Sequence, residues 1–160
     1  RRNVAENHAL FDGIRGVSGR LATDSTAVES TTGGQLTSFD SDGFSLTGTS
    51  AQTNASGGDF VAWNWDMGGS TVSNTNGSIT ANVRANSAYG QSIVSYSGAT
   101  NATVDGSNNG GAYWTIGHGL SQAPELIIAK KRNGVGGWYV GSDSLGSTPW
   151  VRFLSSFCND

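Results

Sequence analysis

The chain has 160 residues, of which 24 are Gly, two are Pro and one is Cys, and the Gly share is about twice the roughly 7% of globular proteins. A formal net charge of −3 and five Trp exclude a disordered chain, which has few aromatics and a high net charge. The composition also excludes a collagen, because the Gly residues have no period of three, and a disulfide scaffold, because a single Cys has no partner in the chain.

Short stretches of alternating apolar and polar residues, which are typical of half-buried strands, recur along the chain. In chain order they are Leu36–Phe39, Phe44–Leu46, Phe60–Asp66, Gly77–Arg84, Gln91–Ser97, Ala112–Ile116, Glu125–Lys131, Trp138–Val140 and Trp150–Leu154. Breakers rich in Gly and Asn separate them, and the best helix candidate, Ser25–Ser30, is one or two turns long. The pattern predicts an all-β fold: an antiparallel, jelly-roll-like β-sandwich with Gly-rich turns and little helix.

Two of these stretches carry more detailed predictions about burial. Glu125–Lys131 is a nearly continuous apolar run, which is typical of a strand buried on both faces. Trp63 and Trp65 would share one face of the strand Phe60–Asp66, so we expect both rings to lie in the core.

A tight hairpin is predicted where Leu36–Phe39 and Phe44–Leu46 flank Asp40-Ser41-Asp42-Gly43. In that turn we expect Gly43 to have a positive φ. Asp40 and Asp42 are also the candidate ligands of a calcium site that is not an EF-hand, because an EF-hand loop needs a Glu where Thr49 stands. The alternative is an acidic hairpin turn without metal.

Groups that catalyse reactions are sparse, since the chain has two His and no nucleophile-elbow motif. His118 lies between Gly117 and Gly119, so we expect it to hydrogen-bond a loop backbone, with a base or ligand role as the alternative. Glu6, Glu29 and Glu125 are the only Glu and do not suggest the paired carboxylates of a glycosidase. The sequence therefore predicts neither enzyme activity nor a cofactor.

Aromatic residues beside Gly- and Asn-rich turns are the candidate glycan-binding residues. Tyr113 and Trp114 follow the turn Asn108–Gly111, and Trp138 and Tyr139 follow Gly136-Gly137. Sugars stack on aromatic rings and hydrogen-bond to neighbouring polar side chains. The alternative interpretation places these rings in the core of a thin sandwich, which for Trp138 is somewhat the more favoured.

Composition also limits the partners of the chain. The densest basic group is Lys130, Lys131 and Arg132, too small to track a nucleic-acid backbone, so no nucleic-acid partner is predicted. No apolar run is longer than Leu126–Ala129, far below the roughly 20 residues that span a bilayer, so no membrane partner is predicted.

Three segments are predicted along the chain. Residues 1–30 form the end of a preceding module or a connecting segment, 31–132 a β-sandwich core module, and 133–160 the start of a following strand pair or module. Arg1-Arg2-Asn3 resembles Lys131-Arg132-Asn133, which fits either a tandem module of about 130 residues or coincidence. We expect the chain to be a fragment of a longer protein.

Five segments together carry a resemblance to a known family. They are NHALFDGIRGVSGRL (Asn7–Leu21), LTSFDSDGFSL (Leu36–Leu46), DFVAWNWDMGG (Asp59–Gly69), QSIVSYSG (Gln91–Gly98) and TIGHGLSQAPELIIAKKR (Thr115–Arg132). In this order they resemble a module repeated in structural, tail-fibre-like proteins of marine tailed bacteriophages. The stretch after Arg132 departs from that pattern, because no His follows Trp138-Tyr139-Val140. The resemblance implies a β-sandwich at the surface of a virion and supplies no catalytic residues.

Two functions are therefore expected for a protein on the extracellular particle surface. The first is a tail-fibre or spike module for host attachment that binds host-surface polysaccharide. The second is a purely structural virion component, a fibre shaft or capsid decoration, that assembles with itself without a ligand. In either case the expected partners are copies of the chain, as a homotrimer, and other virion proteins.

Overall fold

The computed structural model describes residues 3, 5–32, 35–99 and 114–142, and the backbone of 152–154. In these residues it contains strands and no helix, so the predicted all-β class is confirmed. All the strand pairs are antiparallel. That two sheets pack face to face as a sandwich stays a prediction.

The chain divides into two compact units, the first comprising residues 1–64 with 124–160 and the second residues 65–123. The predicted module boundaries at residues 30 and 132 concern repeats in a longer protein and stay a prediction. The two units are described one after the other below.

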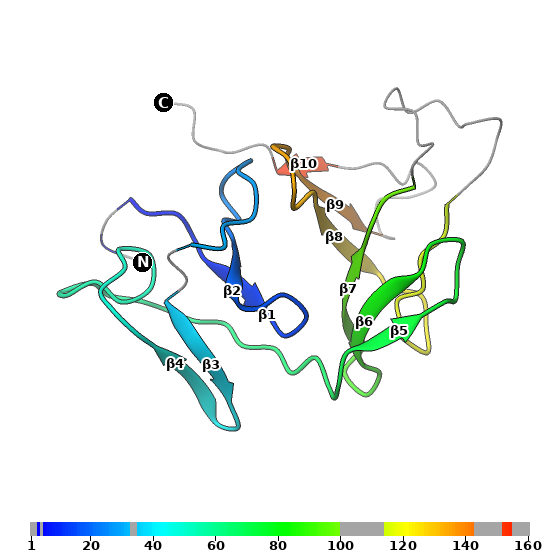
Figure 1. Cartoon of the computed structure of the whole chain (residues 1–160), viewed down its shortest axis with the longest axis horizontal. Helices are drawn as coiled ribbons and strands as arrows, with labels where there is room; N and C mark the ends of the chain where they lie inside the picture. The colour runs from blue at the N-terminus through cyan, green and yellow to red at the C-terminus, as the bar shows by residue number, and fades with distance from the viewer. Residues whose placement is uncertain (1–2, 4, 33–34, 100–113, 143–151, 155–160) are drawn as a thin grey trace. The chain divides into compact units, whose positions relative to one another are not determined.

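Unit 1 contains two hairpins and a three-stranded sheet (Figure 1). The hairpins are β1 (Leu10–Asp12) with β2 (Gly16–Leu21), and β3 (Leu36–Asp40) with β4 (Gly43–Leu46); the sheet has the order β10-β9-β8, from β8 (Leu126–Lys130), β9 (Trp138–Ser142) and β10 (Arg152–Leu154). Leu21, Leu36 and Trp138 are its buried hydrophobic side chains among the described residues.

Unit 2 contains one three-stranded sheet, in which β6 (Ala81–Asn86) lies between β5 (Val72–Asn74) and β7 (Gln91–Tyr96). Ala81 and Val83 are buried, as the predicted alternation of apolar residues in Gly77–Arg84 requires. An isolated bridge joins Ile79 to Ile116 in parallel, which fastens the segment after residue 114 to the sheet.

The predicted hairpin at Asp40–Gly43 is confirmed, because Asp40 pairs with Gly43 across a two-residue loop. The predicted backbone of Gly43 is wrong: Gly43 is not among the glycines with positive φ. A β carbon added there would meet no atom within 4 Å. The turn therefore does not require glycine at this position.

Two predicted elements are absent from the described residues, and a third, the strand Ala112–Ile116, lies partly outside them and shows only the bridge at Ile116 in its described part. Phe60–Asp66 forms no strand, and Trp63 and Trp65 are 71% and 57% exposed. Their predicted burial is wrong, because a strand needs a partner to make an inward face and none pairs with this segment in the described part of the chain. Ser25–Ser30 is not helical; Ser30 instead exchanges backbone hydrogen bonds with Arg20 at 2.9 Å.

The strand predicted at Glu125–Lys131 forms as β8, but its predicted burial on both faces is wrong. Leu126, Ile127 and Ile128 are 58%, 56% and 57% exposed, although their side chains alternate between the two faces of the sheet. The reason is the position of β8 at the end of the strand order, with a neighbour on one side only.

Candidate functional site

The four candidate glycan-binding residues are divided between the two units and the part of the chain that the structure does not describe. Trp114 is 45% exposed and belongs to unit 2, whereas Tyr139 is 40% exposed and belongs to unit 1. Trp138 is only 5% exposed. Tyr113 lies outside the described residues.

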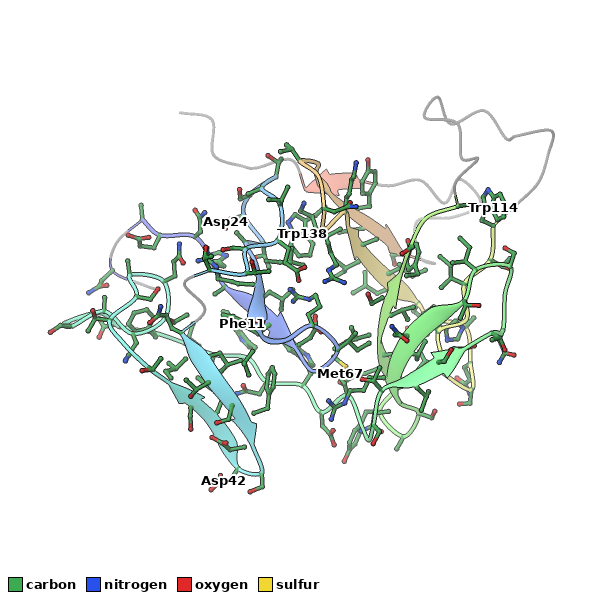
Figure 2. The ribbon with its side chains drawn as sticks, viewed as in Figure 1. Phe11, Asp24, Asp42, Met67, Trp114 and Trp138 are labelled. Carbon is green, nitrogen blue, oxygen red and sulfur yellow. The ribbon has the colours of Figure 1, made fainter. Side chains whose placement is uncertain are left out.

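Trp138 belongs to the core of unit 1, which is the interpretation that the sequence favours for it. Its indole Nε1 donates hydrogen bonds to the carbonyl oxygens of Ala22, at 3.1 Å, and Ser25, at 3.2 Å, so the ring lies against the loop after β2 (Figure 2). Tyr139 follows on the same strand and therefore points to the opposite face of the sheet. The Trp138–Tyr139 pair thus presents at most one ring to a ligand.

A shallow, open pocket of about 410 Å³ lies in unit 2 and is a candidate binding site. Its lining residues come from the end of β5, the turn that follows it, and the segment after Trp114: Asn74, Asn76, Ile116, Gly117, His118, Gly119 and Leu120. Sequence reasoning singled out His118 in this set but missed Asn74 and Asn76. Asn76 lies in one of the Gly- and Asn-rich breakers, and no feature of the sequence shows that this breaker meets residues 116–120.

At two positions the pocket-lining backbone lies so close to neighbouring side chains that only glycine fits, namely at Gly117 and Gly119. A β carbon at Gly117 would lie 2.5 Å from Oδ1 of Asn74, and one at Gly119 would lie 2.8 Å from Cγ1 of Val83. Gly119 also has a φ of +74°, a backbone conformation that favours glycine. Any side chain at either position would force the segment away from the sheet.

Polar groups in the pocket are oriented by local hydrogen bonds. Oδ1 of Asn74 accepts from the backbone N–H of Asn76 at 2.8 Å. Nδ1 of His118 accepts from the backbone N–H of Leu120 at 3.1 Å, which confirms the expected bond to a loop backbone. Because an N–H can only donate, Nδ1 carries no proton, so the ring hydrogen is on Nε2 and remains a donor.

The segment that forms one side of the pocket is fastened by Ser78 and Thr115. The N–H of Ser78 donates to Oγ1 of Thr115 at 2.9 Å, and the N–H of Thr115 donates to Oγ of Ser78 at 2.8 Å. Trp114, labelled in Figure 2, immediately precedes Thr115 of this reciprocal pair, and the pocket-lining residues 116–120 follow it in the sequence. The exposed indole is therefore two residues from a pocket-lining position.

Asp40 and Asp42, the candidate calcium ligands, are at the tip of the β3–β4 hairpin. Oδ2 of Asp40 accepts a hydrogen bond of 2.7 Å from Oγ of Ser45, and bonds from Ser45 and Ser38 hold the pKa of Asp40 below its ordinary value. No group of three or more His, Cys, Asp or Glu that could hold a metal ion occurs in the part of the chain described.

A partly buried ionic cluster in unit 1 is a feature that the sequence analysis missed. Glu29 Oε1 lies 3.0 Å from Nη1 of Arg15, and Oε2 lies 2.7 Å from Nη2 of Arg132. Burial alone would raise the pKa of Glu29, but hydrogen bonds and charge from Arg132 and Arg15 bring it below its ordinary value. Arg15 also bonds to Asp12 and to the carbonyls of Gly19 and Leu10, so the cluster is structural.

Over the residues described, no helix has the length and apolar character needed to cross a membrane. In comparisons with known proteins, no curated protein and no solved structure matches the chain. A family does match, over residues 1–156, and it is described as a domain of unknown function, DUF7483. Since this match covers nearly the whole chain, the protein belongs to the DUF7483 family.

Proposed function

We propose that the chain is a surface module of a bacteriophage virion, in a tail fibre or spike, that attaches the particle to its host by binding surface polysaccharide. The location on a virion rests on the ordered resemblance of five segments to phage tail-fibre-like proteins. In this proposal the module acts by binding alone, without catalysis or cofactor. It works beside other virion proteins and further copies of itself, as a homotrimer.

The observation that carries glycan binding is the connection between Trp114 and the pocket of unit 2. Trp114 offers an exposed ring for the apolar face of a sugar. The amide groups of Asn74 and Asn76 and the Nε2–H of His118 supply both donors and acceptors for hydroxyls at the pocket. An aromatic ring with a few convergent polar groups is typical of small-ligand sites, and Trp114 is two residues from the pocket-lining Ile116.

Electrostatics also favour a neutral sugar at this pocket. The lining residues are Asn, Ile, Gly, His and Leu, with no formal charge among them when His118 is neutral. A charged ligand would therefore find no opposite charge in the lining. The predicted substrate class is a neutral polysaccharide of the host envelope.

Binding of the 160-residue chain to an array of bacterial envelope glycans tests the proposal. We expect Trp114→Ala and Asn76→Ala each to lower the affinity about tenfold or more, since each removes a principal contact. Trp65→Ala is the matched control, because Trp65 is a similarly exposed Trp of unit 2 outside the pocket lining. Equal binding by all four proteins, or no binding by the wild type, would contradict glycan attachment.

The second candidate function is a structural virion component that self-assembles without a ligand. It is favoured by the apolar strand β8, whose Leu126, Ile127 and Ile128 are exposed in the single chain. Electron microscopy of virions labelled with an antibody against the chain separates the two functions. A distal location fits attachment, and a location along a shaft or on the capsid fits the structural role.

A further inference from the structure

Strand β8 combines an open sheet edge with apolar side chains on both faces. It is the terminal strand of the order β10-β9-β8, so one side of its backbone has no strand partner among the described residues. Leu126 and Ile128 point to one face and Ile127 to the other, and all three are more than half exposed. A long apolar edge of this kind pairs readily with another strand.

Lysine side chains commonly protect the edge of a sheet against pairing with another chain. The apolar half of β8 has no such protection. The ammonium of Lys130 donates to the carbonyl oxygen of Lys131 at 2.8 Å and to that of Thr26 at 3.4 Å. The ammonium is therefore directed at its own unit. Its partial burial there lowers the pKa of Lys130. Lys131 lies beyond the last residue of the strand.

The charges at the two ends of β8 indicate which partner fits the edge. Glu125 precedes the strand and Lys131 follows it, in the sequence Glu125-Leu-Ile-Ile-Ala-Lys-Lys131. Ile128 is the midpoint between these two charges. A second copy of the strand, turned antiparallel about Ile128, brings Glu125 of each copy opposite Lys131 of the other.

We infer that β8 is a homotypic docking surface, at which two copies of the chain pair antiparallel with Ile128 opposite Ile128. In this register Ile127 faces Ala129 of the other copy, Leu126 faces Lys130, and two Glu125–Lys131 pairs close the ends. Opposite charges directly across strands stabilise a pair, and like charges destabilise it. The parallel alternative is disfavoured because it would set Glu125 against Glu125 and Lys131 against Lys131.

The pairing would join the two three-stranded sheets into one continuous sheet of six strands. It gives the main-chain groups at the open side of β8 their hydrogen-bond partners and places the apolar side chains of the two copies beside each other. The contact is two-fold and closed, so it adds one partner and stops. Since a two-fold contact cannot close a ring of three, it is separate from the three-fold contact of the proposed homotrimer and is independent of glycan binding.

Cysteine cross-linking tests the register directly. In a Cys158→Ser background, Ile128→Cys places two thiols across the two-fold axis at a separation suited to a disulfide. We expect mild oxidation to link most of this variant into covalent pairs. Val135→Cys, at an even more exposed position of unit 1 outside any strand, is the control and should cross-link at least about fivefold more slowly.

A charge exchange tests which residues meet. Glu125→Lys alone and Lys131→Glu alone each create two like-charge pairs, so each should weaken the association roughly tenfold in analytical ultracentrifugation. The double exchange restores opposite charges only if residue 125 of one copy meets residue 131 of the other. Recovery of at least half of the lost association energy is therefore the expected result.

Ile128→Lys should halve the mass of the wild-type assembly, and an unchanged thermal melt verifies that the variant is folded. The inference is overturned if the wild type stays unpaired at about 100 μM, or if the Ile128→Cys and Val135→Cys variants cross-link equally fast. It is also overturned if the double charge exchange associates no better than the single variants. Those results would mean that the edge is covered within one chain, by a different protein, or in a three-fold contact.

Discussion

Arg132 donates from Nη2 to Oε2 of Glu29 at 2.7 Å, across 103 residues of sequence. The same two residues are joined along the backbone, since the N–H of Glu29 donates to the carbonyl of Arg132 at 2.9 Å. Unit 1 is built from the two ends of the chain, and this double contact fastens the segment after β2 to the segment after β8. The carboxylate of Glu29 is thus a long-range support of the fold.

Replacing Glu29 by Gln is expected to lower the free energy of unfolding by about 2 kcal/mol at pH 7. The change keeps the shape of the side chain but leaves the guanidinium of Arg15, whose side chain is 4% exposed, with less opposing charge. Urea denaturation measures the loss. Arg132→Ala removes the partner that is 44% exposed and should cost less than about 1 kcal/mol.

The stability of the protein should fall on acidification because of the same carboxylate. Arg132 and Arg15 bring the pKa of Glu29 below its ordinary value of 4.5 in the folded state. A carboxyl with a depressed folded pKa stabilises the fold fully above its unfolded pKa, and this contribution is lost as the pH falls through the folded pKa. Denaturation between pH 7 and pH 3 should show a smaller loss in Glu29→Gln than in the wild type. An identical pH dependence would contradict the role of Glu29.

Replacing Trp138 by Ala should lower the free energy of unfolding far more than replacing Trp63 by Ala. Trp138 is buried and its indole bonds to Ala22 and Ser25, so we expect a loss of about 3–5 kcal/mol. Trp63 is exposed, so its replacement should change stability by no more than about 0.5 kcal/mol. Chemical denaturation compares the two variants, and similar losses would show that Trp63 also lies in a core.

The sequence predicted most strands of this fold but missed β1, β2 and β5, and it predicted burial less well than strand formation. β3, β4, β6 and β7 form where local alternation and turn residues indicate them, because hairpin pairing depends on residues close in sequence. Leu126–Ile128 and Trp63 were expected to be buried and are exposed. Burial depends on which distant segment covers a strand, and periodicity carries no information about that.

In the candidate site, too, contacts between residues close in sequence could be predicted, and contacts between distant residues could not. The bond between His118 and a loop backbone was predictable from its flanking glycines, because it spans only two residues. The meeting of Asn74 and Asn76 with residues 116–120 depends on contacts such as Ser78 with Thr115, 37 residues apart. The ion pair of Glu29 with Arg132 was missed for the same reason.

Glycine is required at position 119 but not at position 43. Gly119→Ala combines a positive φ with a β carbon 2.8 Å from Cγ1 of Val83, so we expect it to destabilise the protein by about 2–3 kcal/mol. Gly43→Ala meets no atom within 4 Å and has no positive φ, so its thermal stability should be unchanged or slightly higher. Equal melting temperatures for the two variants would show that the close contact of Gly119 with Val83 is not formed.

Thr115 should matter more for the pocket than for the stability of unit 2. Thr115→Val keeps the volume of the side chain but removes Oγ1, the acceptor for the N–H of Ser78. Because this pair is exposed to water, the loss in unfolding free energy should be only about 0.5–1 kcal/mol. The N–H of Ser78 should nevertheless exchange with solvent several-fold faster, and the affinity for glycan should fall because the segment of Trp114 is less firmly held.

Thr80→Val, on the same stretch and outside these bonds, is the control. Slow exchange at Ser78 in Thr115→Val would mean that another contact fastens the segment.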